Sequence, residues 1–251
     1  MSRPDRVAVV TGTAGGIGSA SAIELSRTCQ IIVGLDRPGA DQSAAREGVR
    51  ALGAEYIALE CDVADEGDVA NAFDEIARQV GAVDVLAHIA GVGGNSADGS
   101  VPRIAETQLS DWNRVVATNL TGTFLVCRAA IPLITQSGAG RIVTTASQTA
   151  RLPTQVSGGH YPASKGGVIM FTRVLALELA EYGVTVNCVS PGLTDTAMAS
   201  AFDQASYSRN VPLGRIARPI DLARAVAFLA SPDNEFITGV VLDVNGGMAM
   251  A

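Results

Sequence analysis

The sequence predicts an α/β fold, a single domain in which a doubly wound parallel sheet carries helices on both faces. Short apolar runs rich in β-branched residues, typical of buried parallel strands, alternate with longer segments of helical periodicity. This alternation favours crossovers that return each strand to the same end of one sheet. Neither a repeat nor a linker rich in proline, serine or glycine divides the chain, so we expect residues 1–251 to form one domain.

The expected elements follow one another along the chain. Apolar runs, of which VAVVT is the first, predict strands at residues 7–11, 31–35, 56–59, 83–88, 141–145, 184–189 and 240–244. The segments between them predict helices at residues 16–27, 41–52, 66–80, 111–136, 163–182 and 220–230. Two irregular stretches, 91–101 and 190–213, each follow a strand and therefore lie at the carboxyl edge of the sheet, where ligands bind in open α/β folds. The length and apolar content of the second stretch predict a substrate lid at about residues 190–213.

Composition excludes several classes of function. The chain has 18 basic and 25 acidic residues without a basic cluster, so we expect no nucleic-acid partner. Its cysteines form no CxxC pair and it has only two histidines, which predicts reduced core thiols and neither a metal site nor disulfides; the cysteines are Cys29, Cys61, Cys127 and Cys188.

The sequence also argues against a targeting or membrane segment. Residues 1–22 resemble a signal peptide, but Asp5 and four glycines do not fit one. The best candidate for a membrane span, residues 115–134, is interrupted by Asn119 and Arg128. We therefore expect a cytoplasmic protein that does not enter a membrane.

The segment TGTAGGIG at residues 11–18 joins the first predicted strand to the first predicted helix. Glycines at Gly12, Gly16 and Gly18, with Ile17 among them, let the backbone turn sharply and approach a pyrophosphate. The amides and the positive dipole at the helix start meet the phosphate charge. This arrangement predicts a dinucleotide site of the Rossmann type.

Asp36 ends the second predicted strand, where a carboxylate accepts hydrogen bonds from the ribose hydroxyls and repels a 2′-phosphate. This favours NAD over NADP as the cofactor, although the neighbouring Arg37 could neutralise a phosphate. Asp36 could also be a simple turn residue. Asp62, followed by Val63 after the third strand, could lie by the adenine ring or cap the helix around Glu66.

Tyr161 and Lys165 lie four residues apart near the start of a predicted helix, so both can project from one face. A nearby positive charge stabilises a phenolate and lowers the tyrosine pKa toward neutral pH, as a general base requires. Lys165 is the only lysine, since the other 17 basic residues are arginines. A chain that uses lysine once favours a chemical role for it.

With these motifs the sequence resembles the short-chain dehydrogenase/reductase family over essentially its whole length. TGTAGGIG matches the family's TGxxxGxG, and the YPASK segment at 161–165 matches its YxxxK. Asn119 corresponds to the family's helix asparagine and Ser147 to its catalytic serine. Pro191 and Gly192, followed by Thr196, are similar to its PGxxxT segment, which contacts the nicotinamide side.

One segment departs from the family pattern. Where the family reads NNAG after the fourth strand, this chain has His88, Ile89, Ala90 and Gly91. Ala90 and Gly91 keep their expected place beside the cofactor. We interpret His88 as a core or sheet-edge histidine, because no second metal ligand accompanies it.

The resemblance implies hydride transfer between a nicotinamide and a carbonyl or secondary alcohol. Tyr161 would remove the alcohol proton or donate it in reduction, and Ser147 would hydrogen-bond the substrate oxygen. Lys165 would lower the Tyr161 pKa and bind the nicotinamide ribose, while Asn119 would hold a water in a proton path. Taken alone, Ser147 could instead be a helix cap and Asn119 a core residue. The resemblance also implies a homotetramer built on helices 111–136 and 163–182 and on the C-terminal region.

These observations predict an NAD-dependent dehydrogenase of a secondary alcohol, or ketone reductase. The candidate pocket ranges 93–100, 148–156 and 193–207, with His160, hold no cation cluster, and Arg151 alone could bind an anion, which favours a neutral substrate, with cyclic alcohols among the candidates. The tail from Ile237 to Gly247 also resembles NADP-dependent 3-oxoacyl-thioester (acyl carrier protein) reductases. A third alternative is a catalytically inactive NAD(H)-sensing protein.

Overall fold

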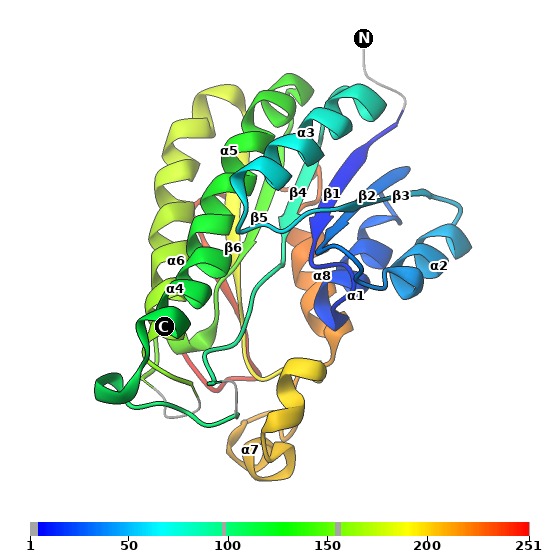
Figure 1. The fold of residues 1–251 in the computed structure, drawn as a ribbon. Coiled ribbons are helices and arrows are strands. Elements are labelled where there is room, and N and C mark those ends of the chain that lie inside the picture. The colour runs from blue at the N-terminus through cyan, green and yellow to red at the C-terminus, as the bar shows by residue number, and fades with distance from the viewer. Residues whose placement is uncertain (1–4, 97–98, 154–156, 251) are drawn as a thin grey trace.

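A single parallel sheet forms the centre of the computed structural model, which describes residues 5–96, 99–153 and 157–250. Its strand order is β3-β2-β1-β4-β5-β6-β7, and every pairing is parallel (Figure 1). The strands are β1 (Val7–Thr11), β2 (Ile31–Asp36), β3 (Glu55–Glu60), β4 (Val85–His88), β5 (Arg141–Thr145), β6 (Thr185–Pro191) and β7 (Val241–Val244). The chain reverses its direction of travel across the sheet between β1 and β4, so the topological switch point lies there.

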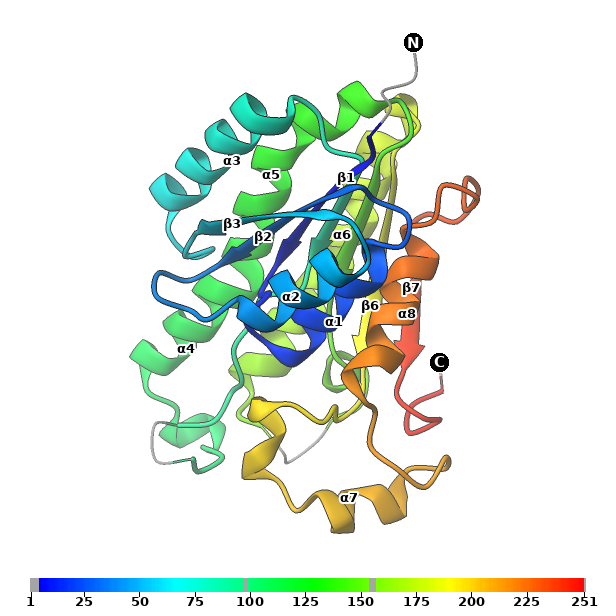
Figure 2. The same cartoon turned by 90° about the vertical axis from the view of Figure 1, so that its right-hand side faces the viewer.

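Helices cover both faces of the sheet, as the alternating pattern predicts. They are α1 (Gly16–Leu25), α2 (Ser43–Ala51), α3 (Glu66–Val80), α4 (Leu109–Val116), α5 (Gly122–Ile134), α6 (His160–Leu179), α7 (Gln204–Asn210) and α8 (Pro219–Leu229). One buried apolar cluster joins the sheet to α3, α5 and α6, and a second joins it to α1, α2 and α8. Figure 2 shows the two helical layers on either side of the strands, with α7 beyond the strands' carboxyl ends.

The predicted helix at 111–136 begins earlier and contains an irregular turn. It begins at Leu109, and a π-helical turn at Ala117–Thr121 separates α4 from α5. Such turns are rare and often occur at functional sites. One described helical segment, Leu109–Ser137, is long and apolar enough to cross a membrane by length and composition. In the fold it packs on α3 and α6.

Two other boundaries matter for the site. Helix α6 begins at His160, three residues before the predicted start, so Tyr161 lies in its first turn. Strand β6 extends through Pro191, so the lid that we predict from residue 190 leaves the sheet after that proline. The lid contains a 3₁₀ segment at Ala197–Ala201 and helix α7.

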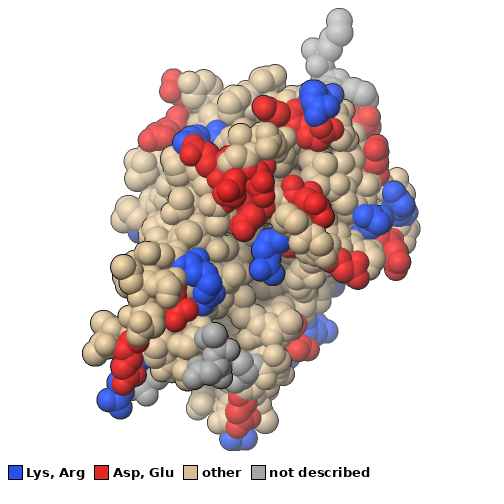
Figure 3. Space-filling model, in the orientation of Figure 1, with Lys and Arg blue, Asp and Glu red and all other residues tan. Residues whose placement is uncertain are grey.

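Figure 3 shows the charged side chains on one face of the molecule. Acidic side chains gather in the upper half of this face, basic ones lie in small separate groups, and no basic patch forms on its described part. This distribution agrees with the net charge of −7.

Candidate active site

The turn between β1 and α1 is closed by backbone contacts that only glycine permits. Gly12 has a φ of 75°, and a Cβ there would lie 3.0 Å from the backbone of Ala90. A Cβ on Gly18 would lie 2.0 Å from the carbonyl oxygen of Gly12. These two glycines therefore hold the start of α1 against the end of β1.

The same turn fits the pyrophosphate and ribose of a dinucleotide. The N-cap of α1 is Gly15, and no side chain caps this helix, so its first amides are available to a phosphate. The Asp36 carboxylate accepts hydrogen bonds from the amides of Ala14, at 2.7 Å, and Arg37, at 2.8 Å. The acidic group at the end of β2 is thus fixed beside the glycine turn, where the adenosine ribose of a cofactor would lie.

Asp62 and Val63 follow β3 at the same edge of the sheet. Asp62 accepts a hydrogen bond from the amide of Ala64 at 2.9 Å, within its own turn. The N-cap of α3 is Asp65, which accepts from the amide of Asp68 at 2.9 Å. The interpretation of Asp62 as the cap of this helix is therefore wrong, and a place beside the adenine stays a prediction.

The hydroxyl of Thr11 ties the ends of β1 and β4 together beneath Ala90 and Gly91. It accepts hydrogen bonds from the amides of Ile89 and Ala90, both at 3.0 Å, and lies 3.0 Å from Nδ1 of His88. Because the amides occupy its acceptor side, its own proton goes to Nδ1, so His88 carries its proton on Nε2. Thr145 donates to the His88 carbonyl oxygen at 2.9 Å and adds β5 to the network.

His88 is a buried core histidine, as we expect from the sequence. Burial, and secondarily the charge of Lys165, lower the pKa of His88 to about 3. The ring is therefore neutral at physiological pH. Its Nε2 atom has no hydrogen-bond partner among the described residues.

Asn119 is fully buried in the π-helical turn and clamps the loop after β4. Its Oδ1 accepts from the amide of Val92 at 2.8 Å, and its Nδ2 donates to the Val92 carbonyl at 3.0 Å. The same Nδ2 donates to the Ser164 hydroxyl at 3.2 Å, and that hydroxyl donates to the Tyr161 carbonyl at 2.7 Å. Asn119 thus joins the loop at Val92 to the first turn of α6.

Ser147 and Tyr161, the predicted catalytic pair, line the same cavity. The Ser147 hydroxyl accepts from the amide and hydroxyl of Thr149, at 3.3 and 3.1 Å, so it also caps the short 3₁₀ turn at Gln148–Ala150. Burial raises the pKa of the Tyr161 phenol, while the Ser147 hydroxyl acts on it in the opposite direction. The burial effect dominates here, so the lowering of the Tyr161 pKa by Lys165 stays a prediction.

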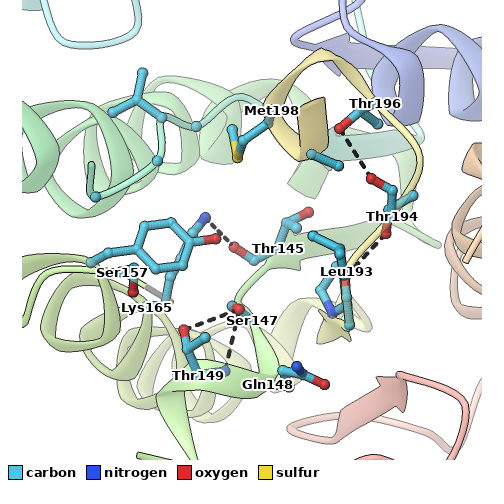
Figure 4. A pocket seen from close by; sticks show the side chains of 18 of the residues that line it. Thr145, Ser147, Gln148, Thr149, Ser157, Lys165, Leu193, Thr194, Thr196 and Met198 are labelled. Carbon is cyan, nitrogen blue, oxygen red and sulfur yellow. Dashed lines mark hydrogen bonds between the residues drawn. The ribbon is translucent and has the colours of Figure 1, made fainter. Parts of the chain in front are cut away.

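Lys165 is buried one turn further along α6. Its Nζ donates to the carbonyl oxygen of Thr145 at 2.8 Å, at the end of β5 (Figure 4). Burial lowers the pKa of this ammonium to about 8. A Cβ on Gly91 would lie 3.1 Å from Oδ1 of Asn119 and 3.3 Å from Nζ of Lys165, so the glycine brings these two groups close to the loop.

These groups meet at a cavity of about 410 Å³ at the carboxyl edge of the sheet. The predicted site residues that line it are Ile17, Gly91, Ser147, Tyr161, Lys165, Pro191, Gly192 and Thr196. Asn119 lies behind the wall at Gly91. Gly16 touches the far side, because a Cβ on it would lie 3.0 Å from the Thr196 methyl.

The segment that we predict to be a lid lines the cavity with apolar side chains. Leu193, Met198 and Phe202 line it, and the Gln148 side chain donates to the hydroxyl of Tyr207 on α7 (Figure 4 labels Leu193, Met198 and Gln148). The Arg151 guanidinium lies 2.7 Å from the Asp243 carboxylate, so it is already paired. Within the candidate ranges, residues 97–98 and 154–156 lie outside the described residues.

Sequence reasoning missed several groups that shape the site. Thr11 acts through its hydroxyl at the end of β1, and its position directly before the glycine turn is the signal that could have marked it. Thr145 acts through its carbonyl at the end of β5, and its position two residues before Ser147 is the corresponding signal. Arg114 on α4 lines the cavity, although no motif marks it. Its contribution depends on how α4 packs on the start of α6.

The fold and the site together define a nicotinamide-dinucleotide-dependent oxidoreductase of the Rossmann type. A family model described as enoyl-(acyl carrier protein) reductase matches residues 12–249. The cis-4-hydroxycyclohexanecarboxylate dehydrogenase of Sinomonas cyclohexanicum is 36% identical over 247 residues, which cover 97% of this chain and 96% of that protein. The 3-oxoacyl-[acyl-carrier-protein] reductase of Homo sapiens is 35% identical, with 98% and 99% covered.

Solved structures show the same relationship. An actinorhodin polyketide ketoreductase variant with NADPH superposes with a TM-score of 0.88 at 32% identity, and 99% of each chain is covered. A short-chain type dehydrogenase/reductase from Mycobacterium marinum gives a TM-score of 0.89 at 28% identity, with 98% of this chain and 96% of that one covered. The chain belongs to the short-chain dehydrogenase/reductase family.

Proposed function

We propose that this protein is an NAD(H)-dependent oxidoreductase that interconverts a secondary alcohol and a ketone. The observation that carries this proposal is the meeting of Tyr161, Ser147 and Lys165 at one cavity beside the glycine turn. When bound, the nicotinamide supplies or accepts the hydride. The chain's own residues then have to bind the substrate oxygen and move its proton.

Tyr161 is the acid and base of this mechanism. Its phenol oxygen takes the hydroxyl proton as the alcohol is oxidised, and returns it when a ketone is reduced. The Ser147 hydroxyl donates to the substrate oxygen and stabilises its developing negative charge. Both side chains line the same cavity, which supports this division of roles, because one substrate oxygen can contact both groups.

Lys165 and Asn119 act through position and charge. The Lys165 ammonium, with its pKa near 8, stabilises the Tyr161 phenolate and binds the nicotinamide ribose. Asn119 holds the loop at Val92 and the first turn of α6 in register, and its turn of π-helix is where we place the water of a proton path. Pro191, Gly192 and Thr196 contact the nicotinamide side, since they line the cavity after β6.

Asp36 supports NAD as the cofactor. Its carboxylate is held beside the glycine turn, where a 2′-phosphate would meet a negative charge. The turn itself, GTAGGIG, carries no cationic side chain. Arg37 follows Asp36 as the neighbouring cation in the sequence of this strand end, and its backbone amide, not its guanidinium, donates to the Asp36 carboxylate.

The substrate body that we propose is largely apolar and cyclic. Leu193, Met198, Ala199 and Phe202 supply an apolar wall over the reacting groups. The Sinomonas relative, whose name specifies a hydroxycyclohexane ring, supports a cyclic alcohol. The cavity volume of about 410 Å³ is within the range of small-molecule sites.

A cofactor comparison tests this proposal. Wild-type protein is assayed with NAD and NADP against a panel of cyclic, aliphatic and hydroxy-acid alcohols. We expect oxidation of cyclic secondary alcohols with kcat/KM at least about tenfold higher for NAD, which corresponds to ~1.4 kcal/mol. In Asp36→Ala the preference should narrow, because the charge that repels a 2′-phosphate is gone. A clear wild-type preference for NADP would refute the role of Asp36.

A second candidate function is favoured by the relatives. Several of them are 3-oxoacyl-[acyl-carrier-protein] reductases, including that of Vibrio harveyi at 34% identity. An NADP-dependent reductase of 3-oxoacyl thioesters would reduce acetoacetyl thioesters with NADPH faster than it oxidises any alcohol with NAD. The same assay, run in the reductive direction, separates the two.

Three further expectations belong to this proposal. Catalysis, rather than NAD(H) sensing alone, is supported by the assembled Tyr161, Lys165 and Ser147. A homotetramer is supported by exposed apolar side chains on α5 and α6, which include Phe124 and Leu177. A cytoplasmic location and the absence of a metal, a membrane and a nucleic-acid partner stay predictions from the sequence.

A further inference from the structure

The substrate cavity carries a cation that the proposed mechanism does not use. Among the described residues that line it, the charged side chains are those of Lys165 and Arg114, and none is a carboxylate. Lys165 is buried behind the reacting groups. Arg114 lies on α4 and contributes to the wall from the other side of the loop after β4.

Contacts across that loop place Arg114 close to Tyr161. A Cβ on Gly94 would lie 2.5 Å from the Cβ of Tyr161, so the loop packs directly on the catalytic tyrosine. The next residue is Asn95, whose carbonyl oxygen accepts a hydrogen bond from Nη2 of Arg114 at 3.3 Å. Asn95 lines the cavity as well. The contact with Tyr161 and the contact with Arg114 are therefore made by two consecutive residues of this loop, Gly94 and Asn95.

The contacts of the Arg114 guanidinium with the described residues are long. Among the described residues its acidic partner is Asp111 on the same helix, at an N–O distance of 3.7 Å, which is longer than a good hydrogen bond. By contrast, Arg151 is tightly paired with Asp243 at 2.7 Å. A guanidinium has five donors in a planar fork, which suits a carboxylate that approaches with both oxygens.

We propose that Arg114 binds a carboxylate on the substrate, at the end remote from the hydroxyl that Tyr161 and Ser147 hold. This inference rests on the proposed alcohol oxidation at the same cavity and narrows its substrate class to hydroxy acids. The sequence favours a neutral substrate because the candidate pocket ranges hold no cation cluster, and Arg151 is the one residue in them that could bind an anion. The packing of α4 supplies a different cation, and the apolar lid then contacts only the ring.

A matched pair of substrates tests this. The probes are cis-4-hydroxycyclohexanecarboxylate and its neutral carboxamide, assayed with NAD on wild-type protein, Arg114→Met and Arg114→Lys. We expect wild type to favour the carboxylate in kcat/KM by about 10- to 100-fold, through KM rather than kcat, because a charge-assisted hydrogen bond is lost in the carboxamide. The preference should disappear in Arg114→Met, partly survive in Arg114→Lys and weaken with added salt.

The control is Arg50→Met, which removes one positive charge from the exposed end of α2 and should keep the preference. Equal use of both probes by wild type, or an equal loss for both in Arg114→Met, would overturn the inference. If neither probe is oxidised, the proposed reaction fails and binding still decides: cyclohexanecarboxylate, which has no hydroxyl, should bind wild type but not Arg114→Met in calorimetry. Equal or absent binding in both proteins would then overturn it.

Discussion

At the scale of single residues, one threonine hydroxyl determines which ring nitrogen of a buried histidine carries the proton. The Thr11 hydroxyl accepts hydrogen bonds from two backbone amides, so it donates its own hydrogen bond to Nδ1 of His88. The ring lies where the family has an asparagine, and it keeps a polar contact across β1 and β4 that an amide would otherwise make. The ends of these strands carry Gly12 and Gly91, so the network fixes the floor of the proposed cofactor site.

Because His88 is buried, we expect wild type to lose stability as the pH falls, and His88→Asn should reduce this loss. The folded-state pKa of His88, about 3, is below its ordinary value of 6.5. Between these two pH values the histidine therefore binds a proton in the unfolded chain but not in the folded protein. The stability is full above pH 6.5 and is lost as the pH falls toward 3. Between pH 7.5 and 5.5 this group costs wild type about 1.3 kcal/mol of unfolding free energy.

Urea unfolding at the two pH values measures the effect. His88→Asn should lose about 1 kcal/mol less than wild type over this interval, because an amide does not titrate. His160 is present in both proteins and cancels in the comparison. Identical pH-dependent losses in the two proteins would show that His88 does not titrate as its burial requires.

Individual site residues were predictable where a motif fixes both residue type and strand end. Tyr161, Lys165 and Ser147 line one cavity, and Asp36 lies beside the glycine turn. Arg114 was not predictable, because its place depends on helix packing that the local sequence does not encode. Asp62 lies at the carboxyl edge of the sheet, as the sequence predicts, but it does not cap α3, because the cap of that helix is Asp65.

At the scale of elements, the start of α1 depends on glycines that cannot be replaced. A Cβ on Gly18 would lie 2.0 Å from a backbone carbonyl, which has no rotamer by which to move away. In α6, by contrast, a Cβ on Gly166 would meet no atom within 4 Å. The two helical glycines are thus a matched pair with opposite expected effects.

Gly18→Ala should therefore lose about 1–3 kcal/mol of stability through overpacking and weaken NADH binding by at least about tenfold. Gly166→Ala should gain about 0.5–1 kcal/mol, since alanine is the better helix former. Urea unfolding and NADH fluorescence titration measure both. Wild-type stability and NADH affinity in Gly18→Ala would contradict the close contact.

The periodicity of the sequence predicted all seven strands, two of them with matching bounds, because continuous β-branched runs have no other stable place in such a domain. It did not predict the π-helical turn at Asn119, since apolar periodicity continues through that turn. It also began α6 after Pro162, whereas a proline is well tolerated in a first helical turn. The π-helical turn and the start of α6 both adjoin proposed catalytic residues.

At the scale of the whole molecule, α6 carries an apolar face that the chain itself does not cover. Met170, Val174 and Leu177 recur at helical spacing and are 56%, 47% and 81% exposed. Phe124 of α5 lies next to this face, in edge-to-face contact with Phe171 at 6.4 Å. Such a continuous face is typical of an interface between subunits.

If these helices join subunits of the proposed homotetramer, Leu177→Glu should lower the mass measured by light scattering from four chains to two or one. A charge buried in an apolar interface without a partner costs several kcal/mol. Leu52→Glu, at the end of α2, is the control and should stay tetrameric. A monomeric wild type would contradict the proposed assembly.

The central claim is that Tyr161 moves the proton of an alcohol in a site built to bind NAD(H). The most direct measurement compares wild type with Tyr161→Phe, in NADH formation from a cyclic secondary alcohol and in NADH binding by fluorescence titration. The account predicts a turnover lower by about 10²- to 10⁴-fold with NADH affinity nearly unchanged, because only the phenol oxygen is removed. Unchanged turnover in Tyr161→Phe would contradict it.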